Sequence, residues 1–154
     1  MKASLVVSAL ALAATAVTSS ASALQFNRSG VDFKAYNAWD AAKIHYYTNG
    51  VRTIATYPTY VIAPIGRNPS TIGHSIYVDG FHYGSSATTS CTLNAYNYNG
   101  SPLASRTVSF TGSGYWTRTI SLSASQTPTW AYFTLLCLIP ANEQGAILGT
   151  AVTP

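Results

Sequence analysis

Apolar and polar residues alternate with a period of two along most of the chain, which is the pattern of half-buried β-strands. Short runs rich in Val, Ile, Thr and Tyr are separated by pairs of turn-forming residues. The pattern predicts strands at 44–48, 51–57, 59–63, 74–79, 87–98, 103–111, 115–123, 130–139 and 145–152. We therefore expect an all-β fold, an antiparallel two-layer sandwich of about eight strands with jelly-roll-like or immunoglobulin-like topology.

One segment departs from this alternation. Residues 33–43 are rich in alanine, and this composition predicts a short helix or turn. Asn37 and Asp40 are the candidate caps of that helix.

Two Asn-Gly pairs, at 49–50 and 99–100, stand between strand-like runs. Asn-Gly accepts positive φ at both central positions of a turn, as the type I′ turn requires, so we expect a two-residue hairpin loop at each pair. For the second hairpin this loop sets the register, placing Cys91 opposite Val108, Thr89 opposite Phe110 and Tyr96 opposite Leu103. The predicted inner face then carries Cys91, Leu93, Ala95, Val108 and Phe110. The outer face carries Ser90, Thr92, Asn94 and Tyr96.

The N-terminus has the three-part layout of a secretory signal peptide. Lys2 gives a positive start, an apolar run covers 5–17, and 21–23 offer small residues for cleavage. The run is shorter than the roughly 20 residues of a membrane-spanning helix, and no second long apolar run follows. We expect a signal peptide at 1–23, a single sandwich domain at 24–154, and a secreted or periplasmic mature chain without a membrane span.

Charged residues make up only 8% of the chain, with a net charge of +4. The basic residues are spread singly, so nucleic acid is not an expected partner. Arg106, opposite Leu93, and Arg118, near Trp116, fall on the apolar phase of their strands. Three interpretations stay open. In the first, the side chains extend from a sheet edge into water; in the second, they form either a cationic site between the sheets or a stack of Arg118 on Trp116; in the third, the register is in error by one residue.

The two cysteines predict one disulfide. Cys91 lies on the inner phase of its strand, and Cys137 shares an apolar phase with alternate residues of 131–139. A cysteine pair in an exported chain normally forms a bridge, and this one closes a loop of about 46 residues. We expect the Cys91–Cys137 bridge to clamp the layered fold and to stabilise it by roughly 3–4 kcal/mol.

Candidate catalytic groups are sparse. The chain has four acids, and neither Asp79 nor Glu143 lies in a motif that pairs it with a second carboxylate, as glycoside hydrolysis requires. His74 and His82 bracket Asp79, but this spacing matches no metal-ligand signature, and His45 lies far away in the sequence. We therefore expect no metal, no cofactor and no catalytic residues. A small exported hydrolase using Asp79, Glu143 or a histidine is the alternative.

Tyrosine is frequent, with 11 residues, and many lie among Asn, Thr, Ser and Gly. A tyrosine ring has an apolar face and a polar tip, which suits a ligand surface, although tyrosine is also common on exposed sheet faces. The expected binding residues are Asn94, Tyr96, Asn97 and Tyr98 around the second hairpin, together with Trp116 and Arg118.

The order of several short motifs resembles a loose group of exported bacterial proteins of unknown function. The motifs are 61–67 (VIAPIGR), 77–79 (YVD), 91–93 (CTL) and 136–140 (LCLIP). In that group a cysteine commonly precedes the first proline, and here Ala63 holds that position. The resemblance implies export, bacterial origin and a β-sandwich, and it implies no activity.

Together these features predict an exported, non-catalytic β-sandwich protein that contacts a glycan or a protein surface through Tyr/Asn-rich faces. The hydrolase and an envelope or assembly component, in which exposed strands pair between chains, are the alternatives.

Overall fold

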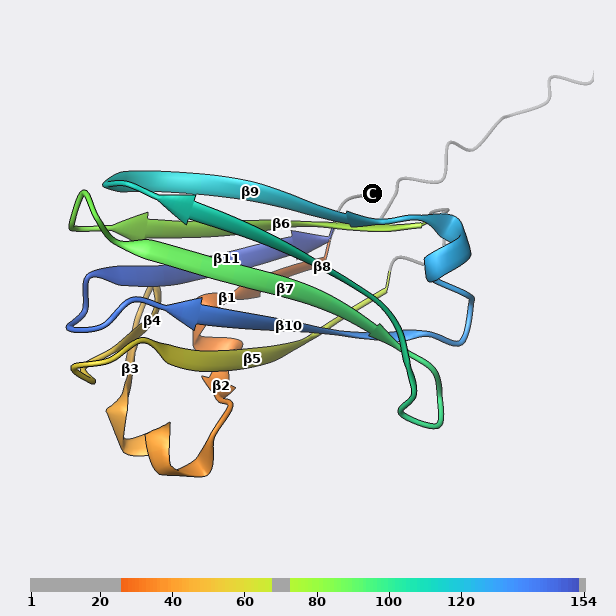
Figure 1. The fold of residues 1–154 in the computed structure, drawn as a ribbon, viewed down its shortest axis with the longest axis horizontal. Coiled ribbons are helices and arrows are strands. Elements are labelled where there is room, and N and C mark those ends of the chain that lie inside the picture. The colour runs from red at the N-terminus through yellow and green to blue at the C-terminus, as the bar shows by residue number, and fades with distance from the viewer. Residues whose placement is uncertain (1–25, 68–72, 153–154) are drawn as a thin grey trace, which may run out of the picture.

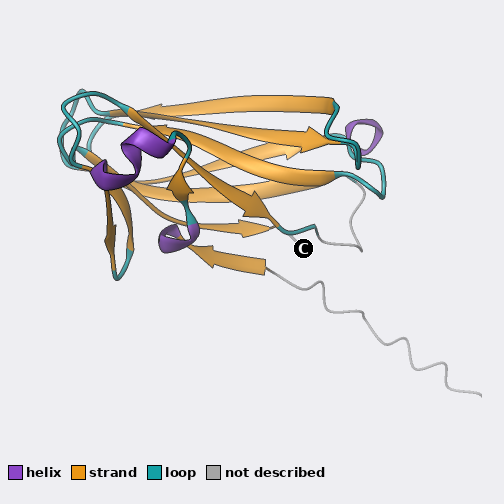
Figure 2. Cartoon of the chain, turned by 90° about the horizontal axis from the view of Figure 1, so that it is seen from below, coloured by secondary structure: helices purple, strands orange, loops and turns teal. Residues whose placement is uncertain are grey.

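The computed structural model describes residues 26–67 and 73–152. Two antiparallel sheets pack face to face, and short helical segments of three to six residues lie at the ends and edges of the sandwich (Figures 1 and 2). The predicted all-β two-layer sandwich is confirmed. The expected signal peptide, 1–23, lies outside the described residues.

Sheet A contains six strands. Its path runs β3 (Ile44–Tyr47), β4 (Gly50–Thr53), β11 (Gly145–Val152), β6 (His74–His82) and β9 (Gly114–Leu122), and β1 (Phe26–Ser29) also pairs with β11. Sheet B contains five strands in the order β2 (Lys34–Ala35), β5 (Thr59–Ile65), β10 (Tyr132–Ile139), β7 (Thr88–Tyr96) and β8 (Pro102–Thr111).

All nine predicted strands are present, and two short strands, β1 and β2, were not predicted. The segment 33–43 is not one helix: Phe33 is fully buried, β2 pairs with β5, and only η2 (Ala38–Lys43) is helical, of 3-10 type. Asn37 precedes η2 without a capping hydrogen bond from its side chain to the backbone. Two further 3-10 turns are η1 (Gly30–Asp32) and η3 (Ala124–Gln126).

The alternation of each central strand explains the core. Every second residue of β10, from Phe133 to Ile139, is buried, as is every second residue of β7 from Thr89 to Ala95. The predicted inner face is confirmed, with Cys91, Leu93 and Ala95 buried. Arg106 sits on the inner phase of the edge strand β8, as the register predicts.

The first predicted turn type is wrong. The 49–50 loop is shifted by one residue: Tyr47 pairs with Gly50, so Thr48 and Asn49 form the loop, and neither Asn49 nor Gly50 has positive φ. Glycine is needed at 50 for another reason, because a Cβ there would lie 2.4 Å from the carbonyl oxygen of Ile147 on β11.

The second hairpin is also not type I′. The amide of Gly100 donates to the carbonyl of Asn97 (2.9 Å), and Gly100 alone takes a positive φ of 83°. The shift this produces pairs Tyr96 with Pro102 rather than Leu103, while Cys91 still pairs with Val108 as predicted.

Two consecutive residues with left-handed backbone conformation occur in a different turn. Asn142 and Glu143, between β10 and β11, have φ of 54° and 57°, and the amide of Gln144 donates to the carbonyl of Ala141 (3.0 Å). The left-handed region is costly for residues other than glycine, so the surrounding contacts must hold this turn in place.

The predicted disulfide between Cys91 and Cys137 is present, but it does not join the two layers. The two residues lie directly opposite each other on the neighbouring strands β7 and β10, and both are buried. The bridge therefore stiffens sheet B, and the sheets are held together by apolar packing. Because these are the only cysteines of the chain, the bridge indicates an oxidising compartment. Within the described residues, no helix is both long and apolar enough to cross a membrane.

Candidate functional site

The aromatic and charged side chains gather on the outer face of sheet A, where β6 ends and β9 begins. We call Tyr47, Arg52, Phe81, Tyr83 and Tyr115 the aromatic platform. The guanidinium of Arg52 lies over the ring of Tyr47 at 4.4 Å and over that of Tyr83 at 4.8 Å. Phe81 meets Tyr83 and Tyr115 edge to face, each with ring centroids 4.7 Å apart. The five side chains thus form one continuous surface across four strand ends.

The backbone explains this grouping. Phe81 points outward from β6 because its neighbours Gly80 and His82 occupy the inner phase, and Phe81 is paired with Tyr115 on β9 and with Ala146 on β11. The β3–β4 hairpin adds Tyr47 and Arg52 on the same outer face. Tyr115 is 79% exposed and Tyr83 52%, so the rings are open to a ligand.

Two depressions meet on the platform. A small one of about 90 Å³ is lined by Asn49, Phe81, Tyr115 and Leu148 together with Arg52 and Tyr83. A wider, shallow one of about 390 Å³ is lined by the same Arg52 and Tyr83 and by the left-handed turn 142–144. Rings at the centre and polar groups at the rim are the composition of small-molecule sites.

Glu143 supplies the negative charge of the rim. Its carboxylate accepts a hydrogen bond from the Tyr47 hydroxyl (2.6 Å) and lies 3.6 Å from Nδ1 of His45. The hydrogen bond to the carboxylate raises the pKa of Tyr47, because loss of the phenolic proton would break it and place two negative charges together. Tyr47 therefore remains a neutral donor at physiological pH.

The four residues predicted around the second hairpin belong to the opposite sheet and its β7–β8 loop: Asn94 and Tyr96 lie on β7, and Asn97 and Tyr98 lie in the loop. Asn94 and Tyr96 line a pocket of about 200 Å³ with residues 102–105. The ring of Tyr96 stacks on Tyr132 (centroids 5.4 Å, 20° between planes). Tyr98 is 79% exposed at the hairpin tip, where its amide donates to the side chain of Asn97.

Trp116, predicted as a binding residue, belongs to the core. It is only 6% exposed, and its ring stacks on Phe110 and lies beside His82. The reason is Gly80, its partner on β6: a Cβ at position 80 would lie 2.1 Å from the indole, so the missing side chain makes room for Trp116.

Arg118 stacks on a ring, but not on that of Trp116. Its guanidinium is exposed and lies 4.7 Å from the centroid of Phe110, and Arg106 donates to the carbonyl of Ser121 (3.3 Å). Both arginines start from the inner phase of an edge strand and span the open side of the sandwich between β8 and β9. Inward-pointing charges of this kind discourage edge-to-edge pairing between chains.

The remaining candidates do not meet. His74 and His82 are buried, whereas Asp79 points outward and accepts a hydrogen bond from Thr117 (2.6 Å). His82 bridges the sheets, with Nδ1 bonded to the carbonyl of Gly112 (2.9 Å) and Nε2 to the Thr89 hydroxyl (2.8 Å). Burial lowers the pKa of His82, so its ring is neutral. In the part of the chain that the structure describes, no three His, Cys, Asp or Glu side chains lie close enough to hold a metal ion.

Sequence comparison assigns no family: no protein-family model matches the chain, and no curated protein matches it significantly. Solved structures do match. The chain is similar to the CBM36-1 domain of a multidomain xylanase from the hindgut metagenome of Trinervitermes trinervoides (TM-score 0.54, 12% identity, 85% of this chain and 98% of that one). It is also similar to a family 36 carbohydrate-binding module in complex with calcium and xylotriose (TM-score 0.51, 14% identity, 83% and 99%). A third similar structure is a family 35 carbohydrate-binding module from Clostridium thermocellum (TM-score 0.50, 13% identity, 84% and 98%). At these identities the likeness establishes the β-sandwich fold.

Proposed function

We propose that this chain is an exported bacterial protein without catalytic activity that binds a glycan on the aromatic platform of sheet A. The observation that carries the proposal is the exposed cluster of Phe81, Tyr83 and Tyr115 around the guanidinium of Arg52. A sugar ring has an apolar C–H face and a hydroxyl edge. The aromatic rings can stack on the C–H face, and Arg52 and Glu143 can form hydrogen bonds with the hydroxyl groups.

The charges of the site favour a neutral ligand. Arg52 contributes one positive charge and Glu143 one negative charge to the same shallow depression, so neither an anion nor a cation is strongly preferred. The likeness to carbohydrate-binding modules supports the same ligand class, since one of them holds xylotriose. Calcium is not part of this proposal, because no three His, Cys, Asp or Glu side chains of the described residues lie close enough together to hold a metal ion.

Retardation in native gels containing xylan, galactomannan, β-1,4-galactan, hydroxyethylcellulose or peptidoglycan tests the proposal. We expect at least one of these to retard the full mature chain, and Tyr115→Ala to weaken that binding about 30-fold, the effect of losing a central aromatic contact of about 2 kcal/mol. Tyr77→Ala is the matched control, because Tyr77 is also exposed on the outer face of sheet A but lies outside the platform. Equal losses in the two variants, or no retardation by any of the five, would contradict the proposal.

One arrangement favours the hydrolase alternative. Glu143 and His45 form a carboxylate–histidine pair at the rim of the wider depression. Glycoside hydrolysis needs a second carboxylate across the bond, and no other acid lines either depression of the platform. Reducing-sugar release that is abolished by Glu143→Gln would support this alternative over the proposed function.

A further inference from the structure

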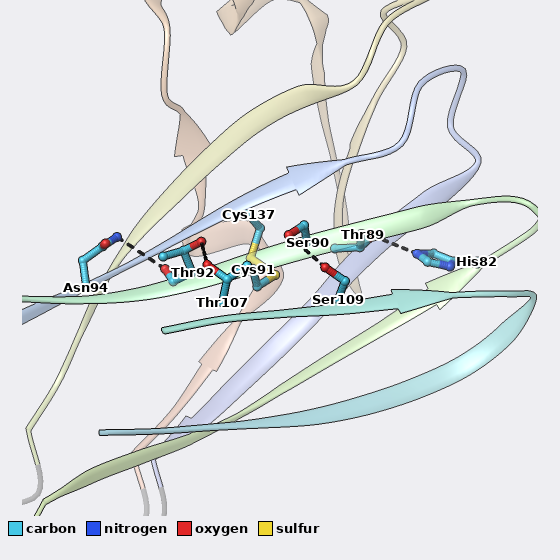
Figure 3. The surroundings of a disulfide bond; sticks show 9 residues. All are labelled: His82, Thr89, Ser90, Cys91, Thr92, Asn94, Thr107, Ser109 and Cys137. Carbon is cyan, nitrogen blue, oxygen red and sulfur yellow. Dashed lines mark hydrogen bonds between the residues drawn. A yellow bond between two sulfur atoms is a disulfide. The ribbon is translucent and has the colours of Figure 1, made fainter. Parts of the chain in front are cut away.

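The outer face of sheet B carries a second polar surface that the platform does not use. Three cross-strand pairs of hydroxyls join β7 and β8: Thr88–Thr111 at 2.7 Å, Ser90–Ser109 at 3.0 Å and Thr92–Thr107 at 2.8 Å. They lead along the strands to the pocket at Asn94 and Tyr96. Figure 3 shows Ser90, Thr92 and Asn94 in line on β7, with Ser109 and Thr107 beside them on β8. We call the three hydroxyl pairs with Asn94, Tyr96 and Tyr132 the sheet B track.

Each hydroxyl pair keeps hydrogen-bonding capacity to spare. A hydroxyl offers one hydrogen and two lone pairs, so a bonded pair uses one hydrogen and one lone pair and still presents one donor and several acceptors. Successive pairs along β7 are two residues apart, so the row from Thr88 to Asn94 covers about 20 Å at about 3.3 Å per residue. A row of this length matches an extended polymer of hydroxyl-bearing units better than a single small molecule.

At the end of this row of hydroxyls lie the pocket with the side-chain amide of Asn94 and the stacked rings of Tyr96 and Tyr132. Tyr96 and Tyr132 lie nearly parallel, Tyr132 is 46% exposed, and Asn94 and Ser105 line the same pocket of about 200 Å³. The surface beneath is rigid, because Cys91, on the other side of the sheet between Ser90 and Thr92, is bridged to Cys137 (Figure 3). A rigid polar surface loses less entropy when a ligand binds.

The track and the platform face in opposite directions. They lie on the outer faces of different sheets, and the pocket of the track, where β7 ends, is at the opposite end of the sandwich from the platform, which lies where β6 ends. Figure 1 shows that β6 and β7 run in opposite directions, with β7 starting where β6 stops. One stretch of glycan cannot lie on both surfaces without turning around an edge of the sandwich.

We propose that the sheet B track is a second glycan site and that a single chain therefore bridges two polysaccharide chains. This inference rests on the proposed function and adds to it the number of sites, their placement and a cross-linking role.

Agglutination of latex beads coated separately with the five polysaccharides named above tests the inference. We expect the wild-type chain to bind and agglutinate the beads of at least one coating. Tyr115→Ala and the double variant Asn94→Ala/Tyr132→Ala should each still bind those beads, with an apparent affinity at least tenfold lower than that of the wild type. Neither variant should agglutinate beads, and a mixture of the two variants should not agglutinate them either. Tyr77→Ala and Tyr60→Ala are the matched controls, because both tyrosines are exposed, one on each sheet and outside both sites, and they should agglutinate as the wild type does.

The outcomes separate the two proposals. If the wild type binds but does not agglutinate, if Tyr115→Ala abolishes all bead binding, or if Asn94→Ala/Tyr132→Ala agglutinates normally, the second site is overturned and the platform stands. If the wild type binds no coating, the proposed function falls and the second site falls with it. Circular dichroism of each variant checks that the sandwich is intact.

Discussion

The two sheets of this sandwich differ in where their chemistry lies. Sheet A carries rings, a guanidinium and a carboxylate on its outer face, and it sends both buried histidines into the core. Sheet B carries paired hydroxyls on its outer face and the only disulfide of the chain on its inner face. The comparison shows that the covalent bridge and the aromatic platform lie in different layers. Each layer can therefore be perturbed separately.

Removal of the disulfide should have the largest effect. Cys91→Ala/Cys137→Ala is expected to lower the free energy of unfolding by roughly 3–4 kcal/mol, because the open loop of 46 residues gains entropy in the unfolded state. Urea unfolding measures this change. Hydrogen exchange should show amides of β7 and β10 losing more protection than those of β6 and β9. Reduction of the wild type with dithiothreitol controls for the missing sulfurs, and a uniform loss of protection in both sheets would contradict the assignment of stiffness to sheet B.

Acidification should act through His74, where sheet A meets sheet B. The ring is buried and stacks on Phe133 of β10 at 4.0 Å, and neither ring nitrogen has a hydrogen-bond partner among the described residues. Burial, and secondarily the charge of Arg67, lowers the pKa of His74 from 6.5 to about 4. As the pH falls, the unfolded chain takes up a proton at His74 before the folded chain does. The contribution of the neutral His74 ring to the free energy of unfolding is therefore complete above pH 6.5, and about 3 kcal/mol of it is lost at pH 4.

His74→Phe should remove that part of the pH dependence while keeping the stack. Unfolding free energies at pH 7 and pH 4 measure the difference for each protein. We expect the variant to lose about 3 kcal/mol less than the wild type between these values. The same loss in both proteins would show that His74 does not control the acid sensitivity.

A smaller effect is expected at the rim of the platform. Glu143 has a φ of 57°, which glycine adopts freely and alanine does not. Glu143→Gly should therefore be about 1 kcal/mol more stable than Glu143→Ala, the reverse of the usual order in a strand. Both variants lose the bond to Tyr47, so both should bind glycan equally weakly. Thermal unfolding and gel retardation check the two parts, and equal stability would indicate that the turn relaxes without cost.

The smallest effect is expected on the face of sheet B. Thr92→Val and Thr107→Val remove one hydroxyl pair, whose cross-strand hydrogen bond is worth about 0.5 kcal/mol. A double-mutant cycle measures this coupling. A coupling above 2 kcal/mol would mean that the hydroxyl pairs are a main stabilising element of the sheet, which would weaken their assignment to ligand binding.

The local sequence pattern predicted much of this structure and little of its candidate site. The alternation in β7 and β10 placed Cys91 and Cys137 correctly, because a strand's period of two is visible in its own residues. The role of Trp116 was not predictable in the same way, since its burial depends on Gly80 across the ladder. The predicted turn types were also wrong where contacts with distant backbone determine the turn. At Gly50, for example, the backbone packs against the carbonyl group of Ile147.

The aromatic platform was missed for the same reason. Tyr47, Arg52, Phe81 and Tyr115 are spread over 69 positions of the sequence and meet only because four strand ends lie together in sheet A. No spacing within the chain marks them. Their shared outer phase, at the ends of their strands, was the one available signal, and it required the strand order to be known.

The most direct test of the account is to map the bound glycan by NMR. The ¹⁵N–¹H spectrum of the mature chain is recorded during titration with an oligosaccharide of whichever polysaccharide retards it most. We predict that amides around Arg52, Tyr83 and Tyr115 shift in a saturable manner, with the turn at Glu143 among them. If these amides stay unchanged while the oligosaccharide saturates another surface, the aromatic platform is not the glycan site.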